Sequence, residues 1–335
     1  MSLEAYIVDV IEGRRPGRVF LKPLSWVYRV GILLRNGCYR RGQLKSIKAP
    51  LPFVSIGNVV AGGSGKTPLV LLLAKELSKT LKVAILSRGY RSRLERENRV
   101  QCITLATPVE EGGDEPCFLK QKLPLAAVWV GKNRILSSQL AADAGAEVAL
   151  LDDGMQYREL YRDVEIVVVD GRDPFGKGGY LPYGYLRDDP KRLQEADLVV
   201  VNHGNETITR QLEALTRAPI VQMRLKFSTD LKGKRVAIFC AIANPQRFVE
   251  AVKEAGAAVM AALFKPDHAS FTLQEIATLA APGLQIICTE KDAVKLPPLP
   301  ENLSVLPIEA HLEIISGHEA WERLIQIIRK EVNHE

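Results

Sequence analysis

Short, continuous apolar segments alternate along the chain with segments of helical pattern. After an apolar start at residue 53, strand-like runs cover residues 82–86, 126–130, 148–151, 165–169 and 198–201, with helix-like runs at 69–77 and 133–144. Uninterrupted apolar strands separated by helices are typical of a parallel sheet that is covered on both faces. The pattern therefore predicts a doubly wound α/β domain, whose functional loops lie at the carboxyl ends of the strands.

The same rhythm starts again in the last third of the chain. Apolar runs at residues 235–240, 257–263 and 285–288 alternate with helical patterns at 245–255 and 273–279. The apolar segments 220–227 and 303–308 flank this unit, and we predict that they pair as a two-stranded connector. A chain of 335 residues is longer than one compact core usually holds. We therefore predict domains at residues 1–217 and 218–315, with an amphipathic helix at 316–335 that packs back on the first domain.

A glycine-rich turn follows the first apolar run and opens the helix-like segment at 69–77. The turn consists of Gly62, Gly63, Ser64, Gly65, Lys66 and Thr67. Glycines let successive backbone N–H groups converge on an anion, and the helix N-terminus adds positive potential. In such a cradle Lys66 reaches the terminal phosphates of a nucleotide and Thr67 holds Mg²⁺. Val60 stands where the usual pattern has glycine, so an ordinary strand-to-helix turn remains the alternative.

Candidate carboxylates follow the apolar run 148–151 and the stretch 181–186, which comes after a glycine-rich loop at 176–179. Asp152 and Asp153 stand at the end of the predicted strand 148–151, where one carboxylate can hold Mg²⁺ and the other can orient water or substrate. The other reading of Asp-Asp-Gly is a plain turn. Arg187 and Asp188 form either a surface pair or a cation and a carboxylate beside a transferred phosphoryl group.

Two further residues carry possible proton-transfer chemistry. Asp114 follows Gly112-Gly113 and is either a helix N-cap or the carboxylate that takes the proton of an acceptor hydroxyl. His268 follows Lys265-Pro266-Asp267, and a single histidine is more often structural than catalytic. Local sequence leaves both pairs of alternatives open.

The net charge of +6 is concentrated near the N-terminus. Every charged residue from 13 to 48 is Lys or Arg, and residues 24–34 form an apolar run with Trp26 and Tyr28 that is too short to cross a bilayer. We predict a helix that lies on an anionic membrane surface, with a solvated structural helix and a nucleic-acid-binding helix as alternatives. The five cysteines have no metal-ligand spacing and indicate reduced thiols in a cytoplasmic protein.

Taken together, these motifs resemble the tetraacyldisaccharide 4'-kinases of lipid A biosynthesis over nearly the whole chain. The residues that carry the resemblance are Asn58 with Gly62–Pro68, Ser87–Tyr90, Gly113–Pro116, Asp152–Gln156, Leu181–Arg187, Asp267-His268 and Thr289–Lys295. The resemblance implies ATP- and Mg²⁺-dependent phosphorylation of the 4'-hydroxyl of a tetraacylated disaccharide 1-phosphate to give lipid IVA. It also implies two α/β/α domains joined by a two-stranded linker, and a location on the cytoplasmic face of the bacterial inner membrane.

The resemblance further implies roles for single residues. Asp114 corresponds to the catalytic base and His268 to its partner, with Lys66 and Arg187 as catalytic cations. The predicted metal-site residues are Thr67, Asp152, Asp153 and Asp188, and the predicted substrate-binding residues are Asn58, Arg88, Tyr90 and Gln156. Tyr157 replaces a histidine of the family pattern, and Asp188 replaces a glutamate.

The expected partners are the acylated disaccharide lipid and the anionic membrane surface, with no nucleic acid and no obligate protein partner. The competing hypothesis is a nucleotide-switched membrane adaptor that hydrolyses ATP or GTP and binds a protein. GTP is disfavoured because Thr289-Glu290-Lys291-Asp292 lacks the Lys-x-Asp spacing that reads guanine.

Overall fold

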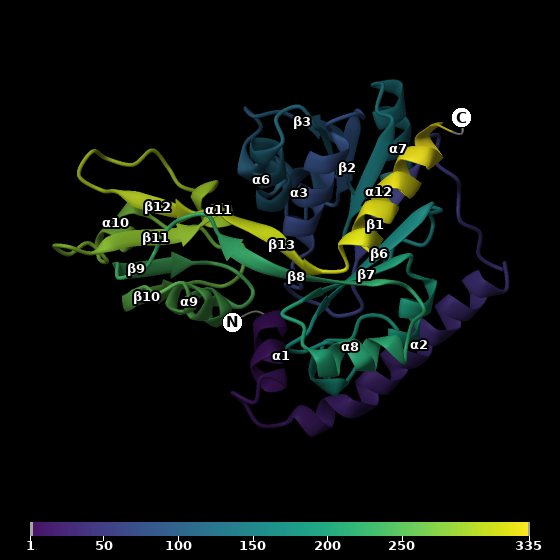
Figure 1. The fold of residues 1–335 in the computed structure, drawn as a ribbon. Helices are drawn as coiled ribbons and strands as arrows, with labels where there is room; N and C mark the ends of the chain where they lie inside the picture. Colours follow the sequence, from purple (N-terminus) through teal and green to yellow (C-terminus); the bar gives the residue numbers. More distant parts are fainter. Residues whose placement is uncertain (1–2, 334–335) are drawn as a thin grey trace.

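Two β-sheets form the framework of the computed structural model, which describes residues 3–333 (Figure 1). Their strands are β1 (Phe53–Gly57), β2 (Val83–Ser87), β3 (Gln101–Ile103), β4 (Ala127–Val130), β5 (Val148–Asp152), β6 (Val164–Asp170), β7 (Leu198–Asn202), β8 (Ile220–Phe227), β9 (Arg235–Cys240), β10 (Ala258–Phe264), β11 (Gln285–Thr289), β12 (Val305–Ile308) and β13 (Ala310–Ser316). Over the described residues, the larger sheet has the order β13-β8-β7-β6-β1-β5-β2-β4-β3 and the smaller sheet the order β10-β9-β11-β12. We call the larger sheet with its helices the first lobe and the smaller sheet with its helices the second lobe.

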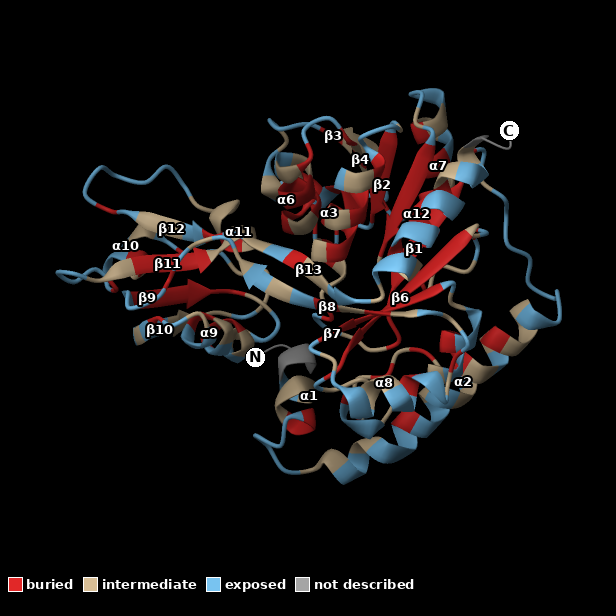
Figure 2. Cartoon of the chain, in the orientation of Figure 1, coloured by how far each residue is buried: buried red, intermediate tan, exposed pale blue. Residues whose placement is uncertain are grey.

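The central strands of the first lobe all run parallel to their neighbours. Strands β3 and β13, at the two edges, are antiparallel to β4 and β8. Every residue of β1, β2, β5, β6 and β7 is buried (Figure 2). A strand that is buried on both faces needs apolar residues at nearly every position, which explains the continuous apolar runs in the sequence. The predicted doubly wound, mostly parallel α/β sheet is therefore confirmed.

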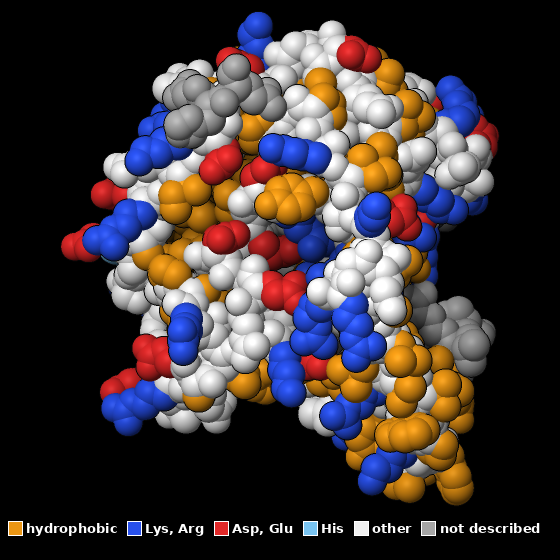
Figure 3. Space-filling model, turned by 90° about the vertical axis from the view of Figure 1, so that its right-hand side faces the viewer, with side chains coloured by type: hydrophobic (Ala, Val, Ile, Leu, Met, Phe, Trp, Pro, Cys, Tyr) orange, Lys and Arg blue, Asp and Glu red, His pale blue; other side chains and the backbone are white. Residues whose placement is uncertain are grey.

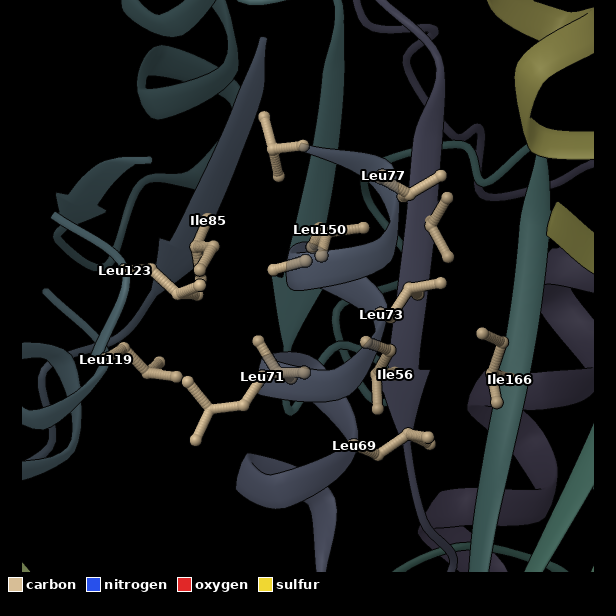
Figure 4. Packing of buried hydrophobic residues seen from close by; sticks show 14 of the residues in the cluster. Ile56, Leu69, Leu71, Leu73, Leu77, Ile85, Leu119, Leu123, Leu150 and Ile166 are labelled. Carbon is tan, nitrogen blue, oxygen red and sulfur yellow. The ribbon is translucent and has the colours of Figure 1, made fainter. Parts of the chain in front are cut away.

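Helices cover both faces of the larger sheet. The helices of the chain are α1 (Leu3–Ile11), α2 (Lys22–Arg40), α3 (Lys66–Leu77), α4 (Arg93–Arg96), α5 (Val109–Gly112), α6 (Asp114–Lys122), α7 (Arg134–Asp143), α8 (Glu206–Glu213), α9 (Pro245–Glu254), α10 (Leu273–Ala277), α11 (Glu290–Ala293) and α12 (His318–Asn333), with 3₁₀ turns η1 (Arg18–Leu21), η2 (Gly176–Gly178) and η3 (Pro190–Glu195). Helices α3, α6 and α12 share one apolar core, whereas α7 and α8 contribute to cores on the other face. Figure 4 shows Leu69 and Leu73 of α3 beside Ile56 of β1. Burial of such leucines holds α3 rigidly on the sheet.

The predicted connector is wrong in its second strand. Strand β8 pairs antiparallel with β13, with Leu225 opposite Leu312, and β8 is joined to β7, so both strands extend the larger sheet. The apolar segment 303–308 instead contains β12, which lies parallel to β11 at the edge of the smaller sheet. Ile308 is buried there, in the core of the second lobe. The larger sheet therefore continues beyond residue 217.

The second lobe repeats the layered arrangement on a smaller scale. Its strands are all parallel to their neighbours, and alternate side chains of β9 enter two different cores. Val236 and Ile238 face the core that includes α9, and Ala237 and Phe239 face the core that includes α10. The terminal helix α12 does not join this lobe, because its apolar side chains enter the core of the first lobe.

Candidate active site

The glycine-rich turn lies between β1 and α3, and two amide side chains hold it in shape. Asn58 Nδ2 donates to Ser64 Oγ at 2.9 Å, and Nδ2 of Asn202, the last residue of β7, donates to the Ser64 carbonyl oxygen at 2.7 Å. Gly62 and Gly65 have φ angles of 110° and 90°, which favour glycine. A Cβ atom on Gly65 would lie 2.2 Å from Asn202 Nδ2 and would displace the amide that donates to Ser64.

Lys66, the first residue of α3, faces a carboxylate from the loop after the neighbouring strand β5. Its Nζ lies 3.4 Å from Asp153 Oδ1 and donates to Asn58 Oδ1 at 3.2 Å. Arg187 Nη1 donates to the other Asp153 oxygen at 2.8 Å, and Arg187 Nη2 contacts Asp153 and Asn58. Asp153 adopts a left-handed backbone conformation with φ 56°, which aims its carboxylate back at the turn. Two cations therefore converge on one carboxylate beside the predicted phosphate cradle.

The adjacent aspartates have opposite pKa shifts. Burial would raise the pKa of the Asp153 carboxyl, but Lys66 and Arg187 outweigh it and hold that pKa well below its usual range. Burial, together with Glu115 and Asp153, raises the pKa of Asp152 to about 7. Burial also lowers the pKa of Lys66. Burial and neighbouring carboxylates disfavour the negative form of such a carboxyl. A bound cation stabilises that negative form.

Thr67, Glu115 and Asp152 supply oxygen donors that fit Mg²⁺. Thr67 Oγ1 lies 3.5 Å from Glu115 Oε1. After burial, the negative charge of Glu115 contributes most to the raised pKa of Asp152. Among residues 3–333 there is no group of three or more His, Cys, Asp or Glu side chains poised to hold a metal. Magnesium in nucleotide sites typically takes one or two carboxylates and completes its shell with phosphate oxygens and water. These three oxygen donors therefore suit Mg²⁺. Glu115 was not among the residues predicted for the metal site.

Asp114 and His268 come from different lobes and meet in the structure. Asp114 begins α6, and His268 lies after β10; the His268 Nδ1 atom is 2.9 Å and 2.8 Å from the two Asp114 carboxylate oxygens. The hydrogen bond to Asp114 raises the pKa of His268. Burial would raise the pKa of Asp114, but His268 and Lys295 outweigh it and lower that pKa. Both pKa shifts therefore favour the charged forms, a carboxylate on Asp114 and an imidazolium on His268.

We expect this pair to stabilise the folded protein most below neutral pH. The pKa of His268 is raised above its usual 6.5 in the folded state, so its contribution is complete below pH 6.5 and is lost as pH rises through the folded-state pKa. Thermal unfolding of the wild type and of His268→Gln, measured from about pH 5 to about pH 9, checks this. The difference between the two melting temperatures should shrink as pH rises; a difference that grows would contradict the assignment.

Further contacts join the two lobes on either side of this pair. Nη1 of Arg247, in the first turn of α9, donates to the carbonyl oxygen of Gly63 at 3.2 Å and pairs with Asp170 at the end of β6. Lys122 Nζ, at the end of α6, pairs with Glu290 of α11 and with Glu309 before β13. The second lobe therefore touches both the glycine-rich turn and helix α6 of the first lobe.

The residues predicted to bind substrate lie in different surroundings. The Tyr90 ring packs edge-on against His268, with 5.6 Å between ring centroids, whereas the half-exposed Arg88 side chain pairs with Glu95. Gln156 Nε2 donates to the Asn58 carbonyl oxygen at 3.0 Å, and Asn58 is 1% exposed. Tyr90 is therefore placed to meet an acceptor, while Asn58 and Gln156 support the turn from inside. Substrate binding by these residues stays a prediction.

The contacts of Asp188 argue against the metal role predicted for it. Its fully buried carboxylate accepts a hydrogen bond from Asn36 Nδ2 at 2.8 Å and lies 3.5 Å from Arg35 Nη2, both on α2. Its Oδ1 also accepts from the Asp189 backbone N–H at 2.9 Å. Both carboxylate oxygens of Asp188 thus help to anchor the N-terminal helix. Of the adjacent residues Arg187 and Asp188, only Arg187 faces the glycine-rich turn.

The outer side of the N-terminal segment is apolar and basic. Phe20 is 86% exposed and Trp26 is 65% exposed, with Val19, Leu24, Val27 and Leu34 also exposed. Figure 3 shows hydrophobic side chains gathered beside Lys and Arg side chains on one projecting part of the surface. The inner side is fixed by polar contacts, since Ser25 Oγ donates to the Tyr180 carbonyl oxygen at 2.7 Å. In the part of the chain that the structure describes, no helix is long and apolar enough to cross a membrane.

Sequence reasoning missed three residues of this region: Glu115, Lys291 and Arg247. Glu115 stands next to Asp114, and Lys291 stands in the Thr289–Lys295 motif, so the motifs that contain them were available signals. The side chain of Lys291 pairs with Glu115 and donates to Thr67 Oγ1 at 3.4 Å. Arg247 belongs to no motif, and only the packing of the lobes identifies it.

Comparison with known proteins independently supports the resemblance to the tetraacyldisaccharide 4'-kinases. The sequence model of the family LpxK, tetraacyldisaccharide-1-P 4'-kinase, matches residues 17–329. The tetraacyldisaccharide 4'-kinase of Chlamydia pneumoniae is 37% identical over 76% of this chain and 75% of that protein. That of Syntrophus aciditrophicus is 33% identical over 95% of each chain. A crystal structure of Aquifex aeolicus LpxK in complex with ATP is 30% identical, has a TM-score of 0.76 and covers 94% of this chain and 99% of its own.

Proposed function

Because the chain belongs to the tetraacyldisaccharide-1-P 4'-kinase family, we propose that it transfers the γ-phosphoryl group of ATP to the 4'-hydroxyl of tetraacyldisaccharide 1-phosphate, giving lipid IVA for lipid A synthesis. One observation carries this proposal beyond the family resemblance. The Asp114 carboxylate lies within 2.8 Å of His268 Nδ1, and the next residue, Glu115, lies 3.5 Å from the Thr67 hydroxyl of the glycine-rich turn. A proton acceptor and a phosphate cradle therefore face the same space.

In the proposed reaction the 4'-oxygen forms a bond to the γ-phosphorus as the bond to the bridging oxygen of ADP breaks. The hydroxyl proton passes to the Asp114 carboxylate, and the His268 imidazolium keeps that carboxylate oriented through its Nδ1–H. Lys66 and Arg187 supply positive charge where the phosphoryl group is transferred. Since Asp114 and His268 come from different lobes, the lobes must be closed on each other for the reaction.

Thr67, Glu115 and Asp152 are the residues that would hold Mg²⁺ in this enzyme. Burial and the neighbouring carboxylates raise the pKa of Asp152 to about 7, so a cation there is favourable. When bound, the ion would neutralise charge on the β- and γ-phosphate oxygens. Asp153 is already paired with Lys66 and Arg187, which makes Asp152 the better candidate of the two adjacent aspartates.

The N-terminal helix is proposed to hold the enzyme on the cytoplasmic face of the inner membrane. Exposed apolar side chains such as Phe20 and Trp26 stand in a segment whose charged residues, from 13 to 48, are all basic. Such a face binds the interface of anionic lipid, where each nearby basic residue contributes about 1 kcal/mol. An acceptor with four acyl chains would reside in that same membrane.

Labelled ATP distinguishes the kinase from the competing adaptor. The protein is incubated with γ-³²P-ATP, with and without tetraacyldisaccharide 1-phosphate, and lipid and inorganic phosphate are separated. Label that moves into the lipid supports the proposal. Hydrolysis that is independent of the lipid and is stimulated by a protein would reject it in favour of the adaptor.

A further inference from the structure

Lys295 places a buried ammonium of the second lobe beside the Asp114–His268 pair. It stands shortly after the end of α11, and its side chain is 6% exposed. Its Nζ lies 3.9 Å from Asp114 Oδ2 and 3.1 Å from Asp292 Oδ1, and it donates to the Ala269 carbonyl oxygen at 3.1 Å. Ala269 is the residue after His268. One ammonium therefore contacts both the proposed proton acceptor and the loop that carries its histidine partner.

The same part of the second lobe fixes Lys295 and His268. The His268 N–H donates to the Ala241 carbonyl oxygen at 3.2 Å, and the Ala241 N–H donates to Asp292 Oδ1 at 3.2 Å. Asp292, which is 1% exposed, accepts a further hydrogen bond from Thr289 Oγ1 at 2.6 Å. Because Ala241 joins the histidine loop to the carboxylate partner of Lys295, the imidazole and the ammonium are held in one fixed arrangement.

The two carboxylate oxygens of Asp114 have different surroundings. Both lie within 2.9 Å of His268 Nδ1, but Oδ1 also accepts from the Glu115 N–H at 2.9 Å, whereas Oδ2 faces the Lys295 ammonium. Charges on both sides of a carboxylate restrict its rotation, which keeps a reacting group in one geometry. Burial raises the pKa of Asp114, and His268 and then Lys295 oppose this effect, which favours the ionised form that can take a proton.

We propose that Lys295 is a positioning residue of the phosphoryl transfer, whose ammonium holds the Asp114 carboxylate and the His268 loop in alignment with the acceptor hydroxyl. This inference rests on the proposed kinase function and assigns Lys295 no contact with the nucleotide. Lys295 gives up no proton and forms no covalent bond, because it acts through Asp114. A misaligned general base lowers the rate of transfer and leaves the affinity for ATP as it was.

The first test uses a variant in which the buried charges stay balanced. Lys295→Met alone would leave the Asp292 carboxylate without its cation, so the variant is Lys295→Met/Asp292→Asn, in which asparagine can still accept from Thr289 Oγ1. We call it the charge-balanced variant. Its kcat for lipid phosphorylation should fall about ten- to a hundredfold, and its dissociation constant for ATP should stay within about twofold of the wild-type value.

The matched control is Lys253→Met, at an exposed position of α9, which should change neither kcat nor the affinity for ATP. If Lys295 only neutralises Asp292 inside the second lobe, the charge-balanced variant will keep the kcat of the wild type. That result overturns the proposal.

A second comparison asks whether Lys295 acts through Asp114. The substitutions of the charge-balanced variant are added to Asp114→Asn, and kcat should fall no further than about twofold, because the base that Lys295 positions is already absent. Losses that multiply in the combined variant would mean that Lys295 affects the site by another route, and would contradict the proposal.

A spectroscopic measurement needs no lipid and separates this inference from the kinase function. The His268 Nδ1 proton, which joins the ring to Asp114, is followed by NMR on protein with ¹⁵N-labelled histidine, and its signal is assigned by its loss in His268→Gln. In the charge-balanced variant this proton should exchange with water about tenfold faster or more. An unchanged exchange rate would reject the proposal. If the wild type phosphorylates no lipid but the exchange rate rises, the alignment of the pair by Lys295 stands and the kinase function fails.

Discussion

Asp114→Asn is expected to lower kcat for lipid phosphorylation by about two to four orders of magnitude, with little change in the affinity for ATP. Asparagine has nearly the same shape and can still accept a hydrogen bond from His268 Nδ1, but it cannot take the hydroxyl proton. The side-chain contacts of Asp114 are with His268, Lys295 and the Glu115 N–H, and none is with the glycine-rich turn. Steady-state kinetics and ATP calorimetry on the same preparation measure both quantities.

The matched control for this substitution is Asp143→Asn. Asp143 is the last residue of α7 and is exposed, so the same chemical change there should leave kcat at the wild-type value. The kcat of His268→Gln should lie between those of Asp114→Asn and Asp143→Asn. This substitution removes the imidazole that orients the Asp114 carboxylate but leaves the carboxylate itself. Wild-type turnover in Asp114→Asn would remove Asp114 from the mechanism.

The sheet of the first lobe was predictable because its central strands are buried on both faces. A strand such as β7 must be apolar at nearly every position, and that pattern is visible without knowledge of its neighbours. The connector was not predictable to the same degree, because 303–308 and 310–316 are both short and partly apolar. Which of them pairs with β8 depends on Ile308 filling the core of the second lobe, which is a non-local contact.

The site was predictable where one local segment creates it and not where two segments meet. Gly65 and Lys66 belong to a strand-turn-helix unit whose geometry follows from the sequence. The surroundings of Asp188 could not be predicted, because its partner Asn36 lies 152 positions away, on a helix whose docking the local pattern does not reveal. Arg247 was missed for the same reason, since its contact with Gly63 spans the two lobes.

Lys66→Met should lower kcat/KM for ATP by about two to three orders of magnitude while the fold is preserved. The Lys66 ammonium is aimed at the mouth of the glycine-rich turn by Asp153 and Asn58, and methionine fills similar space without charge. Asp153 keeps its hydrogen bonds to Arg187, so its partly exposed carboxylate stays paired and the melting temperature should stay close to that of the wild type. Lys75→Met, an exposed position on the same helix α3, is the matched control and should change neither quantity. Since cations at a phosphate site act by stabilising charge that develops in the transition state, retention of wild-type kcat/KM in a folded Lys66→Met protein would show that the nucleotide phosphates do not lie at this turn.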